Sequence, residues 1–230
     1  MDPGDLLFLI SHELPNKLNP IGLWADLLHT ALASHPELAD QLGPLSELQR
    51  AQQQAALALR RLSLAGKLQF GLYRPSPSSF DLAEAACEAV DRVTPLKPNA
   101  GRVHCDVPEV PMLADRGLLT SAMECLLENA LNHGRGVDVR LGAQVTSLGE
   151  QPAIAITVSD RGPGMLPERL NAMLVASQPT SPSARYRGGI GLYLVQAVAK
   201  AMGGTLVAHS SPGQGASFSL RVRTHNVQGL

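Results

Sequence analysis

Two segments near the start of the sequence carry apolar residues at alternating spacings of three and four, and this pattern constrains the fold most. Such spacing is typical of the a and d positions of a coiled coil, so residues 5–34 and 45–66 each predict a long amphipathic helix. Pro36 and the Gly43-Pro44 pair predict a helix-to-helix turn between them. The apolar seams consist of Leu7, Leu14, Leu18, Ile21, Ala25, Leu28 and Leu32, and of Leu45, Leu48, Gln52, Ala55, Leu59, Leu62 and Gly66.

A hairpin of two such helices buries too little apolar surface to be stable alone, so its seams need partners. The economical arrangement is a homodimer in which two hairpins close a four-helix bundle. The alternative is a monomeric hairpin that packs on the rest of the chain.

Composition and charge exclude several classes of function. The 230 residues carry a net charge of −1, with no basic patch that would indicate a nucleic-acid partner. No apolar run approaches the roughly 18 residues that a membrane span needs, and the start MDPGDLLFLIS lacks the basic region of a secretory signal. Cys87, Cys105 and Cys125 are far apart without a CxxC pair, which argues against a disulfide framework or zinc ribbon. We therefore expect a cytoplasmic protein without direct membrane insertion.

The run RPSPSSF resembles a linker, and the pattern changes after it. Helices and antiparallel strands are predicted there in blocks, and the final strands read as a hairpin. This pattern predicts an α+β sandwich. The predicted helices cover residues 82–93, a stretch opening near Asp115, and a stretch that Gly203-Gly204 ends; the predicted strands are RVHCDV, VDVRLGAQVTSL, PAIAITVSD and the two arms of TLVAHSSPGQGASFSLRVR.

Four short stretches in this second part carry candidate chemistry. They are Glu128-Asn129-Ala130 in a helix, SDRGPGM at a strand end, GGIGLYL at a helix start, and SPGQGASFSL before the last strand. Each alone is most often a turn or a cap, but their order is far more specific. The chain has no G-x-x-x-x-G-K-[ST] motif, so a P-loop does not hold phosphate here.

With these motifs in this order, the chain resembles the catalytic core of a bacterial sensor histidine kinase. Residues 1–73 resemble the dimerisation and phosphoacceptor domain, with SHELPNKLN as its histidine box, and residues 74–79 form the linker. Residues 80–226 resemble the ATP-binding catalytic domain, an α/β sandwich of the Bergerat type. The implied ligands are ATP and Mg²⁺.

The resemblance assigns nucleotide-binding roles that the side-chain chemistry supports. A carboxylate at Asp160 can accept from the exocyclic amine of adenine, and Gly162 and Gly164 let the backbone approach the purine. The amide oxygen of Asn129 suits Mg²⁺, a hard cation. The N–H groups of the Gly189-Ile190-Gly191-Leu192 start of a helix suit phosphate.

The segment between Met165 and Gly188 matches the position of the family's mobile ATP lid. Arg185 and Arg187 lie in it, where guanidinium groups could reach phosphates. The family commonly carries a lysine or arginine three residues after the asparagine of the asparagine box. Here Asn132 holds that position with His133 beside it, so both are candidate nucleotide-binding residues.

In this resemblance His12 is the phosphorylated histidine. A neutral imidazole is nucleophilic, and Glu13 beside it can hydrogen-bond the ring and take up a proton. Asn16, one helical turn further on, matches a position where the family's amide or hydroxyl positions water for dephosphorylating a response regulator. An H-E-x-x-H zinc site is excluded because Asn16 stands where the second histidine is needed. Pro15 and Pro20 predict a kink around His12.

Three functions follow as hypotheses. The leading one is an ATP-dependent protein-histidine kinase that phosphorylates His12 and passes the phosphoryl group to a response-regulator receiver domain. The second is a dimeric histidine phosphotransferase with a degenerate ATPase-like domain, because Cys125 and Ala216 depart from the family pattern at the nucleotide site. The third is an anti-sigma-type switch protein with serine-kinase activity. Proteins of that class lack the phosphoacceptor helix pair, so the paired seams of this chain argue against it. Since eleven residues precede His12, we expect the input from a separate sensor protein or from a sensor domain outside this sequence.

Overall fold

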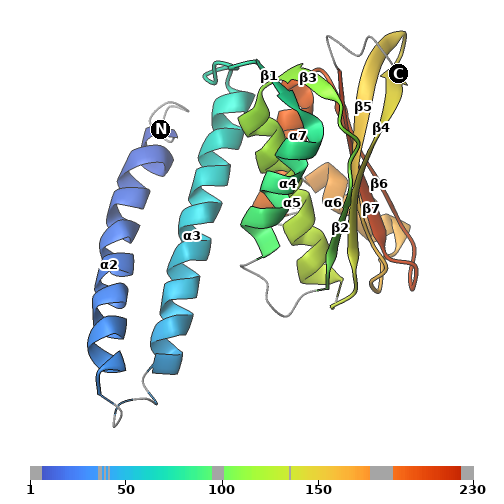
Figure 1. Ribbon diagram of the computed structural model, residues 1–230. Coiled ribbons are helices and arrows are strands. Elements are labelled where there is room, and N and C mark those ends of the chain that lie inside the picture. Colours follow the sequence, from blue (N-terminus) through green and yellow to red (C-terminus); the bar gives the residue numbers. More distant parts are fainter. Residues whose placement is uncertain are drawn as a thin grey trace. The chain divides into compact units, whose positions relative to one another are not determined.

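The computed structural model describes residues 7–35, 38, 40, 42–94, 101–134, 136–176 and 189–223. The chain divides into two compact units, residues 1–70 and 71–230 (Figure 1). Unit 1 is helical, and unit 2 combines helices with β-sheet. No helix in the described ranges combines the length and apolar character of a membrane span.

Unit 1 is an antiparallel helical hairpin, as the two seams predict. A π-helical turn, η1 (Leu9–Glu13), leads into α2 (Leu14–Ala33), which packs along α3 (Leu42–Gln69). The seam residues Ala25 and Gly66 are buried between the helices, and Leu7 occupies the space that a Cβ at Gly66 would fill. The tight approach of the helices therefore depends on small residues at these positions.

The start of α3 differs from the prediction. We expected Gly43-Pro44 to lie in the turn, but both belong to the first turn of α3, which begins at Leu42. A proline is tolerated there because the first N–H groups of a helix have no intrahelical partner.

The predicted kink around His12 takes the form of the π-turn. The N–H of Leu14 bonds to the carbonyl of Leu9, five residues back, so the turn ahead of Pro15 is wider than in an α-helix. Pro15 then falls in the first turn of α2, where its missing N–H costs little. Pro20 remains inside the helix.

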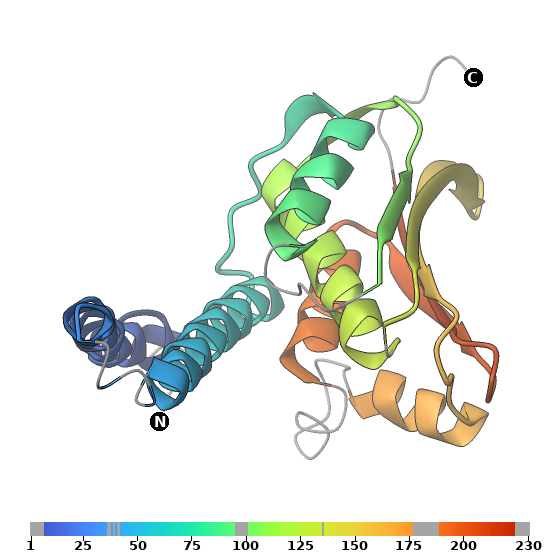
Figure 2. The same ribbon diagram turned by 60° about the horizontal axis from the view of Figure 1, so that its bottom comes forward.

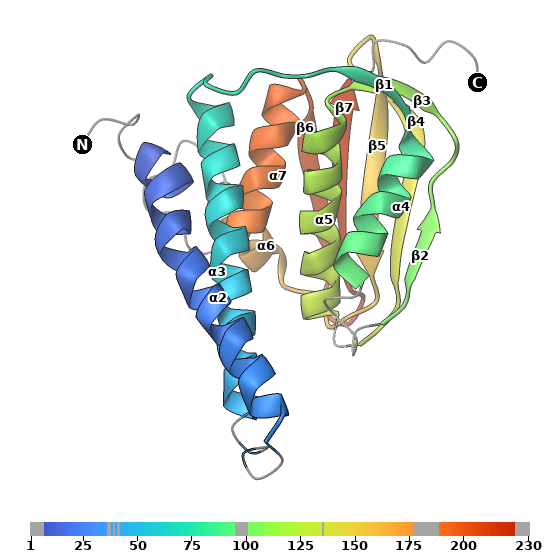
Figure 3. The same cartoon turned by 60° about the vertical axis from the view of Figure 1, so that its left-hand side comes forward.

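Unit 2 contains a five-stranded sheet in the order β2-β4-β5-β7-β6 and a small antiparallel pair, β1-β3. Helices α4, α5 and α7 lie side by side on one face of the large sheet (Figures 2 and 3). The strands are β1 (Ser78–Asp81), β2 (Val103–Asp106), β3 (Pro111–Ala114), β4 (Val139–Leu148), β5 (Gln151–Asp160), β6 (Thr205–Ser210) and β7 (Ala216–Arg223); the helices are α4 (Leu82–Val93), α5 (Arg116–His133), α6 (Pro167–Ala176) and α7 (Gly189–Ala201). The predicted α/β sandwich is thereby confirmed.

The core lies between the sheet and these helices. Leu141, Val158 and Phe218 are cross-strand neighbours on β4, β5 and β7, and all three are buried. Since side chains alternate along a strand, this register defines the helix-facing side of the sheet. Against it α5 presents a nearly continuous buried surface, which includes Leu119 and Met123.

The pairing of β2 with β4 differs from the antiparallel blocks that we expected. These strands run parallel, with Cys105 beside Leu141. Parallel neighbours need a long crossover, and the segment between them supplies it through β3 and α5.

One buried carboxylate connects the start of unit 2 to its central helix. The Oδ1 atom of Asp115 accepts the N–H of Leu118 at 3.0 Å and caps α5. Its Oδ2 atom accepts the Tyr73 hydroxyl and the Ser76 N–H, each at 2.9 Å. The segment 74–79, which we predicted as a linker, thus carries a hydrogen bond to Asp115 and enters β1 at Ser78.

We expect Tyr73→Phe to lower the free energy of unfolding of unit 2 by about 1 kcal/mol at neutral pH, because it removes a hydrogen bond to a carboxylate. Burial, followed by the hydrogen bond and charge of Asp115, raises the pKa of Tyr73 from 10.0 to about 12. The stabilisation is therefore complete below pH 10 and is lost as the pH rises through 12. Urea unfolding of both proteins from pH 8 to pH 12 would test this, and a difference that stays constant with pH would contradict it.

Candidate functional site

The candidate nucleotide residues gather where β5 ends and α5 ends. Asp160 is cross-strand from Val139 and Ala216, two residues beyond buried Val158, so its side chain lies on the helix side of the sheet. Its Oδ1 atom accepts the N–H of Gly162 at 2.8 Å, which holds the carboxylate at the start of the loop. Within the described residues, Oδ2 has no protein hydrogen-bond partner and is free to accept from a ligand.

The glycines of this loop meet the protein's own backbone, a role that the sequence prediction missed. Gly164 has a φ of +61°, and a Cβ there would overlap the carbonyl oxygen of Ser211. A Cβ at Gly162 would come within 2.8 Å of the Gly134 Cα atom. These two glycines therefore allow the strand-end loop to interlock with the β6–β7 turn and the end of α5.

The interlock is completed by hydrogen bonds to the β6–β7 turn. The N–H of Gly213 donates to the Pro163 carbonyl at 2.7 Å, and the N–H of Met165 donates to the Ser210 hydroxyl at 2.9 Å. The Ser210 hydroxyl in turn donates to the Gly215 carbonyl at 2.7 Å. Two of the four motifs found in the sequence, at 159–165 and 211–220, thus form one interlocked edge.

The asparagine box lies on the last two turns of α5. Asn129 is half-buried, whereas Asn132 and His133 are exposed. The helix ends at Gly134, whose N–H bonds to the Ala130 carbonyl at 2.7 Å and which lies beside the Asp160 side chain. The structure therefore brings the asparagine-box end of α5 to the carboxylate-bearing end of β5.

The predicted phosphate-binding glycines open α7, next to α5. Gly189, with a φ of +74°, begins the helix, and a Cβ at Gly191 would lie 3.5 Å from the Cβ of Cys125. Cys125 is buried and fills the space between the two helices. Leu192 is also buried, so its side chain is not available to a ligand. Arg185 and Arg187 lie outside the described residues.

Part of the predicted lid has regular structure. Residues 167–176 form α6, in which Leu170 is buried. The Gln196 side chain on α7 donates to the Leu174 carbonyl at 2.9 Å. This portion is therefore anchored to α7, the helix that begins with the predicted phosphate-binding glycines.

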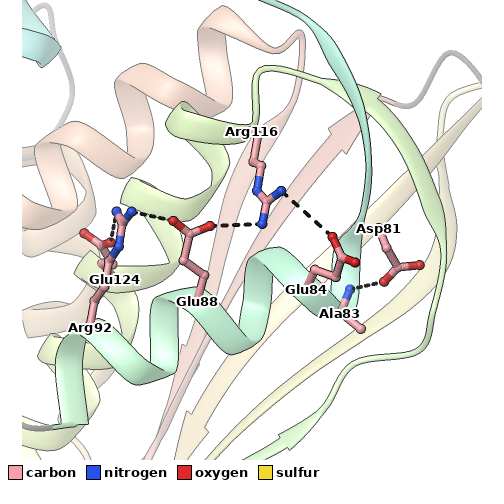
Figure 4. A network of polar contacts seen from close by, with 7 residues as sticks. All are labelled: Asp81, Ala83, Glu84, Glu88, Arg92, Arg116 and Glu124. Atoms are coloured by element: carbon pink, nitrogen blue, oxygen red, sulfur yellow. Dashed lines mark hydrogen bonds and ion pairs between the residues drawn. The ribbon is translucent and has the colours of Figure 1, made fainter.

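Glu124 does not substitute for the residue that Cys125 replaces, because it points toward α4. Its carboxylate accepts from Arg92 at 3.1 Å, and Arg92 also pairs with Glu88 (Figure 4). Glu88 continues the network to Arg116 at 3.1 Å. The ion pairs of this network join α4 to α5.

The residues at the end of α5 offer too few oxygen ligands to hold Mg²⁺ alone, but they fit an Mg²⁺ ion that is also bound by nucleotide phosphates. No group of three or more His, Cys, Asp or Glu side chains that could hold a metal occurs in the described part of the chain. Asn129 offers one amide oxygen, and Mg²⁺ characteristically takes one or two protein ligands, several waters and substrate phosphates. The residues present are compatible with that mode of binding.

His12 lies on the hairpin of unit 1. Its ring contacts that of Phe8, with centroids 5.1 Å apart and planes tilted by 37°. His12, Glu13 and Asn16 are all exposed. Among the described residues no hydrogen bond joins Glu13 to His12, so the expected orientation of the ring by Glu13 is absent from this conformation. The neighbouring Ser11 hydroxyl lies 2.6 Å from that of Ser63, which links the π-turn to α3.

A hollow of about 250 Å³ lies beside the β6–β7 turn. Ser159, Ser217 and His209 are cross-strand neighbours that line it, and alternation places them on the sheet face opposite the Asp160 side chain. Asp160 also lines this hollow, which therefore borders the strand end that carries a candidate nucleotide residue.

The interlocked loop gives a matched pair of substitutions. We expect Gly164→Ala to destabilise unit 2 by at least about 2 kcal/mol more than Gly213→Ala, because both positions have positive φ but only at Gly164 does a Cβ meet backbone. Thermal and urea unfolding of the two variants would measure the difference. Equal losses would contradict the proposed packing.

Comparison with known proteins agrees with this geometry. Residues 114–226 match the model of the family described as histidine kinase-, DNA gyrase B-, and HSP90-like ATPase. The Mycobacterium bovis sensor-like histidine kinase SenX3 is 30% identical over 226 residues, which are 94% of this chain and 52% of that protein. The Mycobacterium tuberculosis sensor protein KdpD is 28% identical over 91% of this chain and 24% of its own length. The chain thus spans between about a quarter and a half of these curated relatives.

Solved structures show the same fold. The crystal structure of full-length ShkA in complex with AMPPNP superposes with a TM-score of 0.72 at 20% identity, covering 97% of this chain and 47% of that one. The Acinetobacter baumannii histidine kinase AdeS gives a TM-score of 0.60 at 18% identity, covering 94% of this chain and 98% of that one. These matches confirm the resemblance to a sensor histidine kinase catalytic core: residues 114–226 match the model of the histidine kinase-, DNA gyrase B- and HSP90-like ATPases, and relatives that align along nearly the whole chain include proteins named as sensor histidine kinases.

Proposed function

We propose that this chain is an ATP-dependent protein-histidine kinase that phosphorylates His12 and then transfers the phosphoryl group to an aspartate of a response-regulator receiver domain. The observation that carries the proposal is the junction of the two motif-bearing ends, Asp160 on β5 and the asparagine-box end of α5, in a chain that also presents an exposed histidine on a helical hairpin. The ATPase family match supports ATP binding. ATP is the proposed donor, so we place the reaction in the cytoplasm.

Adenine recognition is assigned to Asp160. Its Oδ1 atom is occupied by the Gly162 N–H, so the orientation of Oδ2 is set before a ligand binds. An ionised carboxylate accepts from the exocyclic amine of adenine and repels the carbonyl that guanine carries at that position. Adenine is therefore preferred over guanine.

The phosphates are assigned to the α5–α7 side. Helix α7 begins at Gly189, where free N–H groups and the helix dipole favour an anion. Asn129 would hold Mg²⁺ together with the phosphates, and the ion would neutralise charge on them. Asn132 and His133 are exposed at the end of α5 and are candidates for contacts with the nucleotide.

In the transfer step, a ring nitrogen of His12 attacks the γ-phosphorus, the bond to the bridging oxygen of ADP breaks, and the ring proton passes to a base. Glu13 is the proposed base, which requires its carboxylate to turn toward the ring. Asn16 is proposed to position water when the receiver domain is dephosphorylated. All three side chains are exposed, so they are accessible to bound ATP and to the receiver domain.

The homodimer is proposed to form through the apolar side chains that the hairpin leaves uncovered. Ile21, Trp24, Leu27 and Leu28 on α2 are between 44% and 65% exposed, and Leu48 on α3 is 48% exposed. Ile21, Leu28 and Leu48 belong to the predicted seams, yet within the hairpin about half of each side chain stays exposed. A second hairpin would cover them and complete a four-helix bundle.

We expect Leu28→Asp to weaken dimerisation by about 100-fold, because a carboxylate would be desolvated in the interface. Leu113→Asp is the matched control, since Leu113 is 43% exposed but lies on β3 of unit 2. Light scattering over a range of concentrations would measure both variants. A dimer that Leu28→Asp leaves intact would contradict the interface.

Incubation with γ-labelled ATP and Mg²⁺ tests the kinase. We expect an acid-labile, base-stable label on the wild type and none on His12→Ala. His29→Ala, which alters a histidine on α2 of the same hairpin, should keep the label. Asp160→Asn should lose most of it through weaker ATP binding, measurable separately by calorimetry.

Two results would contradict the kinase assignment. A label that survives in His12→Ala would exclude this residue as the acceptor. No label, together with acceptance of phosphoryl by His12 from a phosphorylated receiver domain, would favour the histidine phosphotransferase, an outcome to which the buried Cys125 beside Gly191 points.

A further inference from the structure

The spacing of the cysteines along the sequence indicated no pair, but the fold brings two of them together. Cys87 lies on α4 and Cys105 on β2, the edge strand of the large sheet, and these two elements pack against each other. Cys105 pairs with buried Leu141, so its side chain is on the helix side of the sheet, facing α4. Both cysteines are exposed, whereas Cys125 is buried.

The two thiols are direct neighbours. Although Cys105 is exposed, partial desolvation of its thiol is the main cause of a raised pKa; contact with the Cys87 thiol also raises this pKa, and a hydrogen bond with the Val107 backbone lowers it. Exposure makes a thiol accessible to an oxidant, and a second thiol beside it can convert the resulting sulfenic acid into a disulfide.

We propose that Cys87 and Cys105 form a redox modification site that a peroxide converts into an intramolecular disulfide between α4 and β2. One thiolate attacks the peroxide, the O–O bond breaks, and a sulfenic acid and water form. The second thiol displaces the hydroxyl as water and forms the S–S bond. Overall, two thiols and hydrogen peroxide give one disulfide and two water molecules, with both sulfur atoms oxidised and both peroxide oxygens reduced.

The disulfide would act on the helix layer. Helix α4 is joined to α5 by the ion pairs of Arg92 with Glu124 and of Glu88 with Arg116. A bond to β2 would therefore tie the sheet edge to the two helices that this network already connects (Figure 4). It would also restrict the unfolded chain by closing the loop between residues 87 and 105. In a reducing compartment, such a bond forms transiently and reverses with thiol reductants.

The test treats the full chain with a small excess of hydrogen peroxide and digests it without reduction. Trypsin cleaves after Arg92, Arg102 and Arg116, so the three cysteines fall in three different peptides. We expect a crosslinked pair of the peptides that contain Cys87 and Cys105. The intact chain should lose the mass of two hydrogen atoms and should not be crosslinked to a second chain. Thermal unfolding of the oxidised protein should shift upward by roughly 5–10 °C and return with dithiothreitol.

Cys87→Ser and Cys105→Ser should abolish the crosslink and the shift, and Cys125→Ser should retain both. Faster formation at alkaline pH is expected because the thiolate is the nucleophile. Separate sulfinic acids on the two cysteines, crosslinks between chains, or a crosslink that includes Cys125 would each overturn the proposal. None of these results depends on kinase activity.

Discussion

The carboxylate of Asp115 is the interaction on which unit 2 depends. It starts α5 by accepting the Leu118 N–H, and it holds the segment that enters the unit through Tyr73 and Ser76. Helix α5 then carries Cys125 against α7 and Asn129 toward the end of β5. One buried group therefore sets both the entry of the chain and the origin of the helix that carries the candidate residue Asn129, because hydrogen bonds with three donors offset the cost of its burial.

Much of this architecture could be predicted from the sequence, because local signals agreed with the final packing. The helix at 82–93 and the start of α5 after Asp115 follow from apolar periodicity and capping. The joint order of the motifs around Asn129 and Asp160 pointed to the ATPase fold. Apolar residues recur every 3.6 positions in a helix and every second position in a strand when the element buries one face. Most elements of unit 2 bury one face in this way.

What could not be predicted depends on contacts between distant residues. The glycine at 164 was assigned to ligand approach, but its neighbour is Ser211 in a turn far along the chain. The π-turn at Leu9–Glu13 has no distinctive spacing, since one extra residue in a turn leaves the surrounding apolar pattern intact. The proximity of Cys87 to Cys105 likewise follows from the crossover that brings β2 beside β4 and beneath α4.

The position of β7 determines when the nucleotide edge can form during synthesis. This strand, residues 216–223, is inserted between β5 and β6, and it pairs Ala216 with Asp160. The loop that contains Gly164 rests on the turn just before β7. Neither the large sheet nor this loop–turn edge can therefore be complete until β7 has left the ribosome. The helical hairpin, made of local contacts, is available long before that. On polysomes, the proposed pairing of hairpins could therefore begin while the second units of the same chains are still unfolded.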